Sequence, residues 1–300
     1  MLPFKLVFHP EFNLKLGAHV FPAQKYRRVR EQLVADGLAH DGDFVAPEPA
    51  SRADALRVHD AAYLDKLETG AFTEPELRTF ELPWSREIVA AFHLGAGGTM
   101  LAGRLARRDG CAILIGGGFH HAFADHGEGF CLLNDVAIAV RALQASGEAP
   151  RVAVFDLDVH QGNGTGAILG RDPSVFTVSL HQEHTYPGVK PPNTIDVGLE
   201  DGTDDTAYLA ALAVPLERTL AFRPDVLFYL AGADPYEHDT LGGLGLTLAG
   251  LRERDRRVFA AAREARVPVA VTLAGGYAAR PADTVAIHVA TVATAAEVYR

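Results

Sequence analysis

The 300-residue sequence is poor in cysteine, in positive charge and in long apolar runs, and each shortage excludes a class of protein. Its two cysteines, Cys111 and Cys131, are too few for a disulfide framework, which favours a reducing, cytoplasmic location. The formal net charge of −10 predicts no nucleic-acid partner held by bulk electrostatics. We expect no membrane-spanning stretch, and the apolar run in the opening MLPFKLVFHP is too short for a signal peptide.

What remains is the composition of a globular α/β protein. With 48% hydrophobic residues, the chain suffices for one large domain, and we expect residues 1–300 to form a single one. The densest basic stretch, Lys25 to Arg30, is interpreted as the solvated face of an early helix and not as a binding patch.

Apolar runs alternate with helical patterns along most of the chain. The predicted strands are residues 4–8, 111–115, 151–155, 175–180, 225–230 and 267–273. The predicted helices are residues 86–107, 135–144, 206–221, 247–265 and 281–299. This alternation predicts an open, mostly parallel sheet with helices on both faces.

Glycine and polar residues follow five of these strands. The segments are GGGFHHAF (116–123), DLDVHQGNG (156–164), SLHQEHTYPG (179–188), GADPYEHD (232–239) and AGGY (274–277). In an open parallel sheet, ligands bind outside the carboxyl ends of the strands, where several loops meet. We therefore expect the five segments to share one site.

The segment DLDVHQGNG carries the clearest candidate ligands. On an extended chain Asp156, Asp158 and His160 lie on one side, and burying them unpaired costs several kcal/mol, roughly. Hydrogen bonds, water or a metal ion can each offset that cost. Asp234 also follows a buried strand, and two aspartates with one histidine are typical of a catalytic zinc site with an open position. Ferrous iron suits the same nitrogen and oxygen ligands.

Other side chains in these segments suit catalysis or substrate binding. A metal-activated water needs a base, and His120 or His121 fits that role near neutral pH, although paired loop histidines are also common on surfaces. Asp156 is placed to orient one histidine. The hydroxyl of Tyr277 can stabilise a developing oxyanion, or the ring can simply pack. Phe130 and Tyr186 lie in glycine-containing loops and can form the walls of an apolar channel.

With the motifs GFHHA, GFC, DLDVHQGNG, GAD and GGY in this order, the chain resembles the zinc-dependent histone deacetylase family of the arginase and deacetylase superfamily. The stretches HPEFNLKLGAHVFPAQKY and DTLGGLGLT resemble its class IV branch and bacterial relatives. The resemblance implies zinc ligands, a base with a companion histidine, a carbonyl-polarising tyrosine and a channel. By this resemblance Asp158, His160 and Asp234 are the zinc ligands, and His121 is the base. His120, paired with Asp156, is its companion, and Tyr277 polarises the carbonyl. The channel is lined by Phe130, Gly129, Tyr186 and Leu241. The resemblance also implies a K⁺ ion at Asp156, Asp158, His160, Ser179 and Leu180.

The chain departs from the family pattern at three places. Asn163 stands where some members carry an aspartate behind the second histidine, and this neutral partner should leave His121 with a lower proton affinity. The acidic residue that grips the substrate backbone has an uncertain counterpart near Glu81. Gly162 stands where the arginase branch needs a further carboxylate, which disfavours a two-metal site.

We therefore predict a zinc amidohydrolase that removes an acetyl or acyl group from lysine side chains of proteins or peptides. One alternative is a small-molecule deacetylase acting on acetylpolyamines or a related metabolite. Another is an inactive acyl-lysine-binding module, against which the complete set of histidines and Tyr277 argues. By the resemblance, Leu241 stands where polyamine-selective relatives place a glutamate, and this favours acyl-lysine. The alternatives are that Leu241 only packs under its loop and that Glu237 or Asp239 supplies the missing charge.

Overall fold

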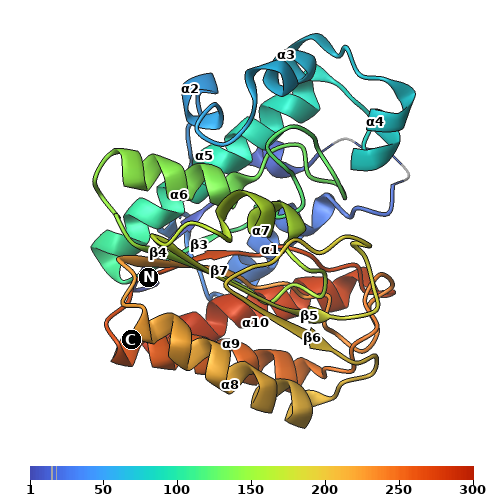
Figure 1. Ribbon diagram of the computed structural model, residues 1–300. Helices are drawn as coiled ribbons and strands as arrows, with labels where there is room; N and C mark the ends of the chain where they lie inside the picture. The colour runs from blue at the N-terminus through green and yellow to red at the C-terminus, as the bar shows by residue number, and fades with distance from the viewer. Residues whose placement is uncertain (15, 18) are drawn as a thin grey trace.

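The protein is built around one sheet of eight parallel strands in the computed structural model, which describes residues 1–14, 16–17 and 19–300 (Figure 1). Lys15 and Ala18, within the opening motif, lie outside the described residues. Across the sheet the order is β2 (Phe44–Val45), β1 (Lys5–Val7), β3 (Cys111–Leu114), β8 (Val269–Thr272), β7 (Val226–Leu230), β4 (Val152–Asp156), β5 (Val175–Gln182) and β6 (Ile195–Leu199).

Helices cover both faces of the sheet (Figure 1). The long α5 (Arg86–Asp109) packs with α6 (Asp135–Ala145) on one face, where α2 (Arg52–Ala55), α3 (Ala61–Thr69), α4 (Glu74–Phe80) and α7 (Asn163–Leu169) also lie. The opposite face carries α8 (Asp205–Ala221), α9 (Leu248–Glu264) and α10 (Pro281–Tyr299), with α1 (Gln24–Ala35) packed on α10. Short 3₁₀ turns occur at Pro10–Phe12 and Asp41–Asp43.

Covering on both faces explains the sequence of the inner strands. Every residue of β3, β4, β7 and β8 is buried, so these strands read as continuous apolar runs, as strands of a two-sided parallel sheet do. The edge strand β6 alternates between half-buried and exposed residues and contains Asp196 and Gly198. That pattern lacks an apolar run, which is why the sequence did not predict β6.

The predicted α/β architecture is confirmed, with all six expected strands and all five expected helices present. The interpretation of Lys25 to Arg30 as a solvated helix face is wrong for Lys25, which is 3% exposed and donates from Nζ to the carbonyl of Ala274 at 2.8 Å. The α5 helix is long and apolar enough to cross a membrane by length and composition. However, 78% of its most apolar window is buried inside the protein, as for a core helix.

The register of the strands brings the polar loops to one edge. Asp156, the last residue of β4, stands opposite Ser179 of β5 and Leu230 of β7. Leu230 in turn stands opposite Thr272 of β8, which pairs with Leu114 of β3. The loops after β3, β4, β7 and β8 therefore begin at the same level of the sheet, while β5 continues three residues further to Gln182.

Candidate active site

Three buried ligand groups converge above the carboxyl ends of β4 and β7. Asp158 and His160 follow β4, Asp234 follows β7, and one ligand atom from each lies within 4.8 Å of the others. A backbone contact fixes the two loops together, because the amide of Val159 donates to Asp234 Oδ1 at 2.9 Å. The structure thus brings the predicted ligands together within one site.

The surroundings of these three residues fit a divalent cation. Asp234 Oδ2 is buried without a hydrogen-bond partner among the described residues, which is costly for a carboxylate unless a cation meets it. Gly275 leaves space beside it, since a Cβ there would collide with the same oxygen, and its amide donates to Asp158 Oδ2 at 2.8 Å. Two carboxylates and one imidazole form a donor set suited to Zn²⁺ and to Fe²⁺.

The electrostatics of the three groups also favour a positive charge between them. Burial alone would lower the pKa of His160, but Asp158 and Asp234 outweigh it and raise that pKa to about 10. Burial and the neighbouring Asp158 raise the pKa of Asp234 to about 7. The cluster therefore holds excess negative charge, which a bound cation would neutralise.

The two adjacent histidines differ in protonation. His120 Nδ1 contacts Asp156 Oδ2 at 2.6 Å, and although burial opposes it, Asp156 and Asp158 raise the pKa of His120 to about 9. His121 Nδ1 contacts Asn163 Oδ1 at 2.7 Å, and burial with the nearby His120 and His160 lowers the pKa of His121 well below its ordinary value. At neutral pH His120 is a cation and His121 a neutral base.

Asp135, at the start of α6, holds the loop that carries His120 and His121 by hydrogen bonds. Its carboxylate accepts from the amides of Gly118 at 3.0 Å and Phe119 at 2.7 Å, and from the hydroxyl of Thr99. These bonds fix the backbone immediately before His120 and His121. The two imidazole rings lie 4.1 Å apart, centroid to centroid.

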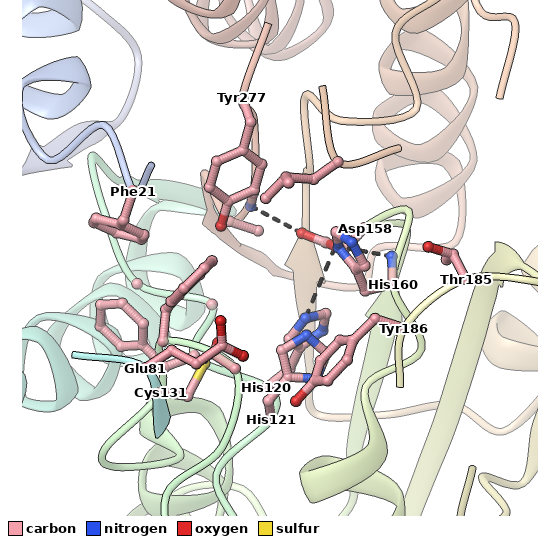
Figure 2. A pocket seen from close by; sticks show the side chains of 18 of the residues that line it. Phe21, Glu81, His120, His121, Cys131, Asp158, His160, Thr185, Tyr186 and Tyr277 are labelled. Atoms are coloured by element: carbon pink, nitrogen blue, oxygen red, sulfur yellow. Dashed lines mark hydrogen bonds and ion pairs between the residues drawn. The ribbon is translucent and has the colours of Figure 1, made fainter. Parts of the chain in front are cut away.

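An apolar channel of about 240 Å³ leads to His120, His121, Asp158 and His160. Figure 2 shows Tyr277 and Phe21 on one side of it, opposite His121 and Tyr186. Phe130 lies 6.2 Å from Tyr277, centroid to centroid. Burial and the carboxylates of Asp158 and Asp234 raise the pKa of Tyr277 well above its ordinary value, so its hydroxyl stays protonated and able to donate. Gly129 and Leu241 also line the channel.

All four residues expected in the channel line it, whereas Ser179 and Leu180, expected at the K⁺ site, lie outside its lining. Ser179 and Leu180 lie on β5, with Ser179 opposite Asp156, the last residue of β4. Glu81 does line the channel, with its backbone carbonyl 2.8 Å from His19 Nε2. Its position leaves the expected role in substrate gripping as a prediction.

Sequence reasoning missed several side chains that position the site. Asp239 accepts from the amides of Leu241 at 2.9 Å and Tyr277 at 2.6 Å, so it ties the rim to the tyrosine loop. Phe21 and Tyr26 come from the N-terminal segment to line the channel. No spacing rule connects these residues to the motifs.

Comparisons with known proteins find matches along nearly the whole chain. The profile of the histone deacetylase domain matches residues 19–293. The chain is 40% identical over 298 residues to an uncharacterized protein of Picosynechococcus sp., covering 99% of each chain. It is 35% identical over 278 residues to Histone deacetylase 2 of Arabidopsis thaliana, covering 89% of this chain and 72% of that relative. The crystal structure of acetylpolyamine aminohydrolase from Burkholderia pseudomallei has the same fold, with a TM-score of 0.80 at 24% identity, covering 97% of this chain and 98% of that chain.

Proposed function

Because the chain belongs to the histone deacetylase family, we propose that it is a zinc-dependent deacetylase that hydrolyses the amide of an acylated lysine side chain in a protein or peptide. The observation that carries this proposal is the convergence on one channel of a three-residue metal site, a neutral histidine beside a cationic one, and a protonated tyrosine. In a metal-dependent amidohydrolase, groups of these kinds activate water, transfer protons and stabilise the oxyanion.

The proposed roles follow from the contacts. Asp158, His160 and Asp234 would hold the zinc ion, which would supply Lewis acidity toward the amide oxygen and lower the pKa of a water. His121 donates from Nδ1 to Asn163, which leaves Nε2 free to accept a proton from the water whose oxygen bonds to the amide carbon.

The remaining groups stabilise charge in the transition state. The Tyr277 hydroxyl donates to the carbonyl oxygen as it becomes negative. His120, kept cationic by Asp156, adds positive charge at the floor of the pocket. Protonated His121 then returns its proton to the departing amine, which leaves as a neutral group.

Substrate choice rests on the rim. Leu241 offers no charge to the distal ammonium of a polyamine, and Asp239 nearby is engaged with backbone amides. A polyamine would therefore lose hydration at an apolar rim without compensation. The likeness in fold to acetylpolyamine aminohydrolase keeps acetylated polyamines as the second candidate.

We also propose a K⁺ ion at Asp156, Asp158, His160, Ser179 and Leu180, supported by the pairing of Asp156 with Ser179 where β4 ends. A reducing, cytoplasmic location is supported by two buried free cysteines. A third candidate, an inactive acyl-lysine-binding module, has against it the complete set of acid, base and oxyanion groups in the channel.

The test is a panel of acetyl-lysine peptides and acetylpolyamines offered to the zinc-loaded protein, with acetate release as the readout. We expect turnover with a higher kcat/KM for peptides, and none in Asp158→Ala or after chelation. Binding of acetyl-lysine peptide without any acetate release would instead support the binding module.

A further inference from the structure

One carboxylate beside the channel has no part in the proposed reaction, yet it contacts the residue that holds the proposed base. Glu128 Oε1 accepts from Asn163 Nδ2 at 2.7 Å and from the Tyr186 hydroxyl at 2.7 Å. Building on the proposed function, we propose that Glu128 is a positioning residue that sets the orientation of the Asn163 amide and, through it, the tautomer of His121.

The argument begins with the ambiguity of an amide side chain. The two ends of Asn163 have nearly the same shape, but one only accepts and the other only donates. Its Oδ1 faces His121 Nδ1 at 2.7 Å and also accepts from the Gly164 amide at 3.0 Å, while its Nδ2 faces Glu128. An ionised carboxylate only accepts hydrogen bonds, so Glu128 admits only the donating end of Asn163.

The orientation of the amide decides where His121 carries its proton. With Asn163 Oδ1 against it, Nδ1 must be the protonated nitrogen, and Nε2 keeps the lone pair that accepts a proton. A reversed amide would present its NH₂ group to Nδ1 and would place the ring proton on Nε2. In that tautomer His121 lacks a basic atom on the side that faces the pocket. Glu128 thus fixes the orientation of Asn163. An aspartate in place of Asn163 would need no such partner, because both of its oxygens accept hydrogen bonds.

Glu128 remains charged in this setting. Burial would raise the pKa of Glu128, but hydrogen bonds from His126, Tyr186 and Asn163 outweigh it and lower that pKa. Its side chain is 19% exposed, whereas Asn163 is 1% exposed, so the contact lies at the boundary between the pocket and solvent.

The same oxygen links the base to the channel wall. The Tyr186 ring packs edge-on against His121, with centroids 4.9 Å apart, and its hydroxyl ends on Glu128. Gly129, next to Glu128, lacks the Cβ that would meet the Tyr186 hydroxyl at 2.7 Å and His121 Cδ2 at 2.9 Å. Glu128, Asn163, His121 and Tyr186 therefore form one closed cluster.

The experiment exchanges acceptor for donor at this position. Glu128→Lys offers only donors, whereas Glu128→Gln retains an acceptor without charge. The control is Asp125→Lys, which makes the same charge change on the same loop at a residue that contacts His126 and not Asn163. The readout is the ¹⁵N NMR tautomer of His121 in the zinc-loaded protein, assigned with His121→Gln, together with kcat and KM.

We expect the Nδ1–H tautomer in wild type, Glu128→Gln and Asp125→Lys. In Glu128→Lys the proton moves to Nε2 and kcat falls on the order of 10²-fold, the lower range for losing a general base, with a smaller change in KM. Glu128→Gln should lose less than about tenfold in kcat, which corresponds to less than about 1.4 kcal/mol in the activation free energy. If Glu128→Lys keeps the Nδ1–H tautomer and the kcat of Asp125→Lys, the proposal is overturned.

A second variant protects the test against misfolding of Glu128→Lys. Asn163→Asp places a carboxylate directly against Glu128, and like charges in contact destabilise each other. Its melting temperature should fall and should recover in Asn163→Asp with Glu128→Gln, whereas equal loss in both backgrounds overturns the contact. A wild-type protein without deacetylase activity would overturn only the proposed function, because the tautomer measurement does not need turnover.

Discussion

At the scale of single residues, the site gives two adjacent histidines opposite pKa shifts. Asp156 keeps His120 cationic, while burial keeps His121 neutral, although the two residues are adjacent in sequence. The difference comes from their partners, a carboxylate for one and an amide for the other. The neutral Asn163, which the sequence indicated, does face His121. Burial is the first cause of the lowered pKa.

Tyr277 should matter for turnover and not for metal binding. In the proposed reaction its protonated hydroxyl donates when the carbonyl becomes an oxyanion, so Tyr277→Phe should lose on the order of 10² in kcat, as for one oxyanion donor. Zinc content, measured by elemental analysis, should stay at one per chain. Near wild-type kcat in this variant would remove Tyr277 from the mechanism.

Leu241 should set the choice between peptide and polyamine. Leu241→Glu places a charge at the rim, where an acetylpolyamine would carry its distal ammonium, and so should raise kcat/KM for the polyamine by about tenfold, an effect of about 1.4 kcal/mol. Leu248→Glu, at an exposed leucine outside the channel lining, is the control. A wild-type preference for the polyamine would reverse the assignment of substrate.

At the scale of elements, the inner strands and long helices were predictable because their burial produces continuous or periodic apolar patterns. The ligands Asp158 and His160 were predictable because strand alternation places them on one side and parallel strands end together. Glu128, Asp239 and Lys25 were not, because their partners are 35, 38 and 249 residues away and only the folded chain pairs them. Local patterns carry no information on such contacts.

Arg254 of α9, a residue with 0% exposure, contacts the loops that carry Asp158 and Asp234. Its Nη1 donates to the carbonyl of Gly232 at 2.7 Å, two residues before Asp234, and lies 3.4 Å from the carbonyl of Leu157, next to Asp158. Nη2 lies 2.8 Å from Asp255. The guanidinium therefore links both loops that carry metal-site carboxylates.

Arg254→Met should leave Asp255 buried without its cation and destabilise the protein by about 3–5 kcal/mol, measured by urea unfolding. Zinc affinity, measured by chelator competition, should fall by about tenfold, as for lost supporting contacts. Arg252→Met on the same helix removes only an exposed pair with Glu297 and should change stability by less than about 1 kcal/mol. Equal stability of the two variants would contradict this role of Arg254.

At the scale of the whole molecule, buried neutral histidines make stability depend on pH. His59 joins the α3 side of the protein to α6, because its Nδ1 lies 2.9 Å from the Phe123 carbonyl and the Asn134 amide donates to its Nε2 at 3.1 Å. Burial lowers the pKa of His59 to about 4. As pH falls from about 6.5 to 4, the unfolded chain binds a proton that the native protein does not, so folding is disfavoured.

This histidine should therefore contribute a loss of about 3 kcal/mol between pH 7 and pH 4, by linkage. Urea unfolding across that range should give a flatter pH dependence for His59→Gln than for wild type. His184→Gln, at an exposed histidine, should keep the wild-type slope. Parallel slopes for wild type and His59→Gln would show that this residue does not carry the pH dependence.

The whole-molecule account depends on a single metal ion placed where the five strand-end loops meet. The most direct measurement is acetate release from an acetyl-lysine peptide by protein stripped of metal and then titrated with zinc. We predict no release by the stripped protein and full recovery at one equivalent of zinc, the capacity of the cluster of Asp158, His160 and Asp234. Full activity without metal, or recovery that requires two equivalents, would contradict the account.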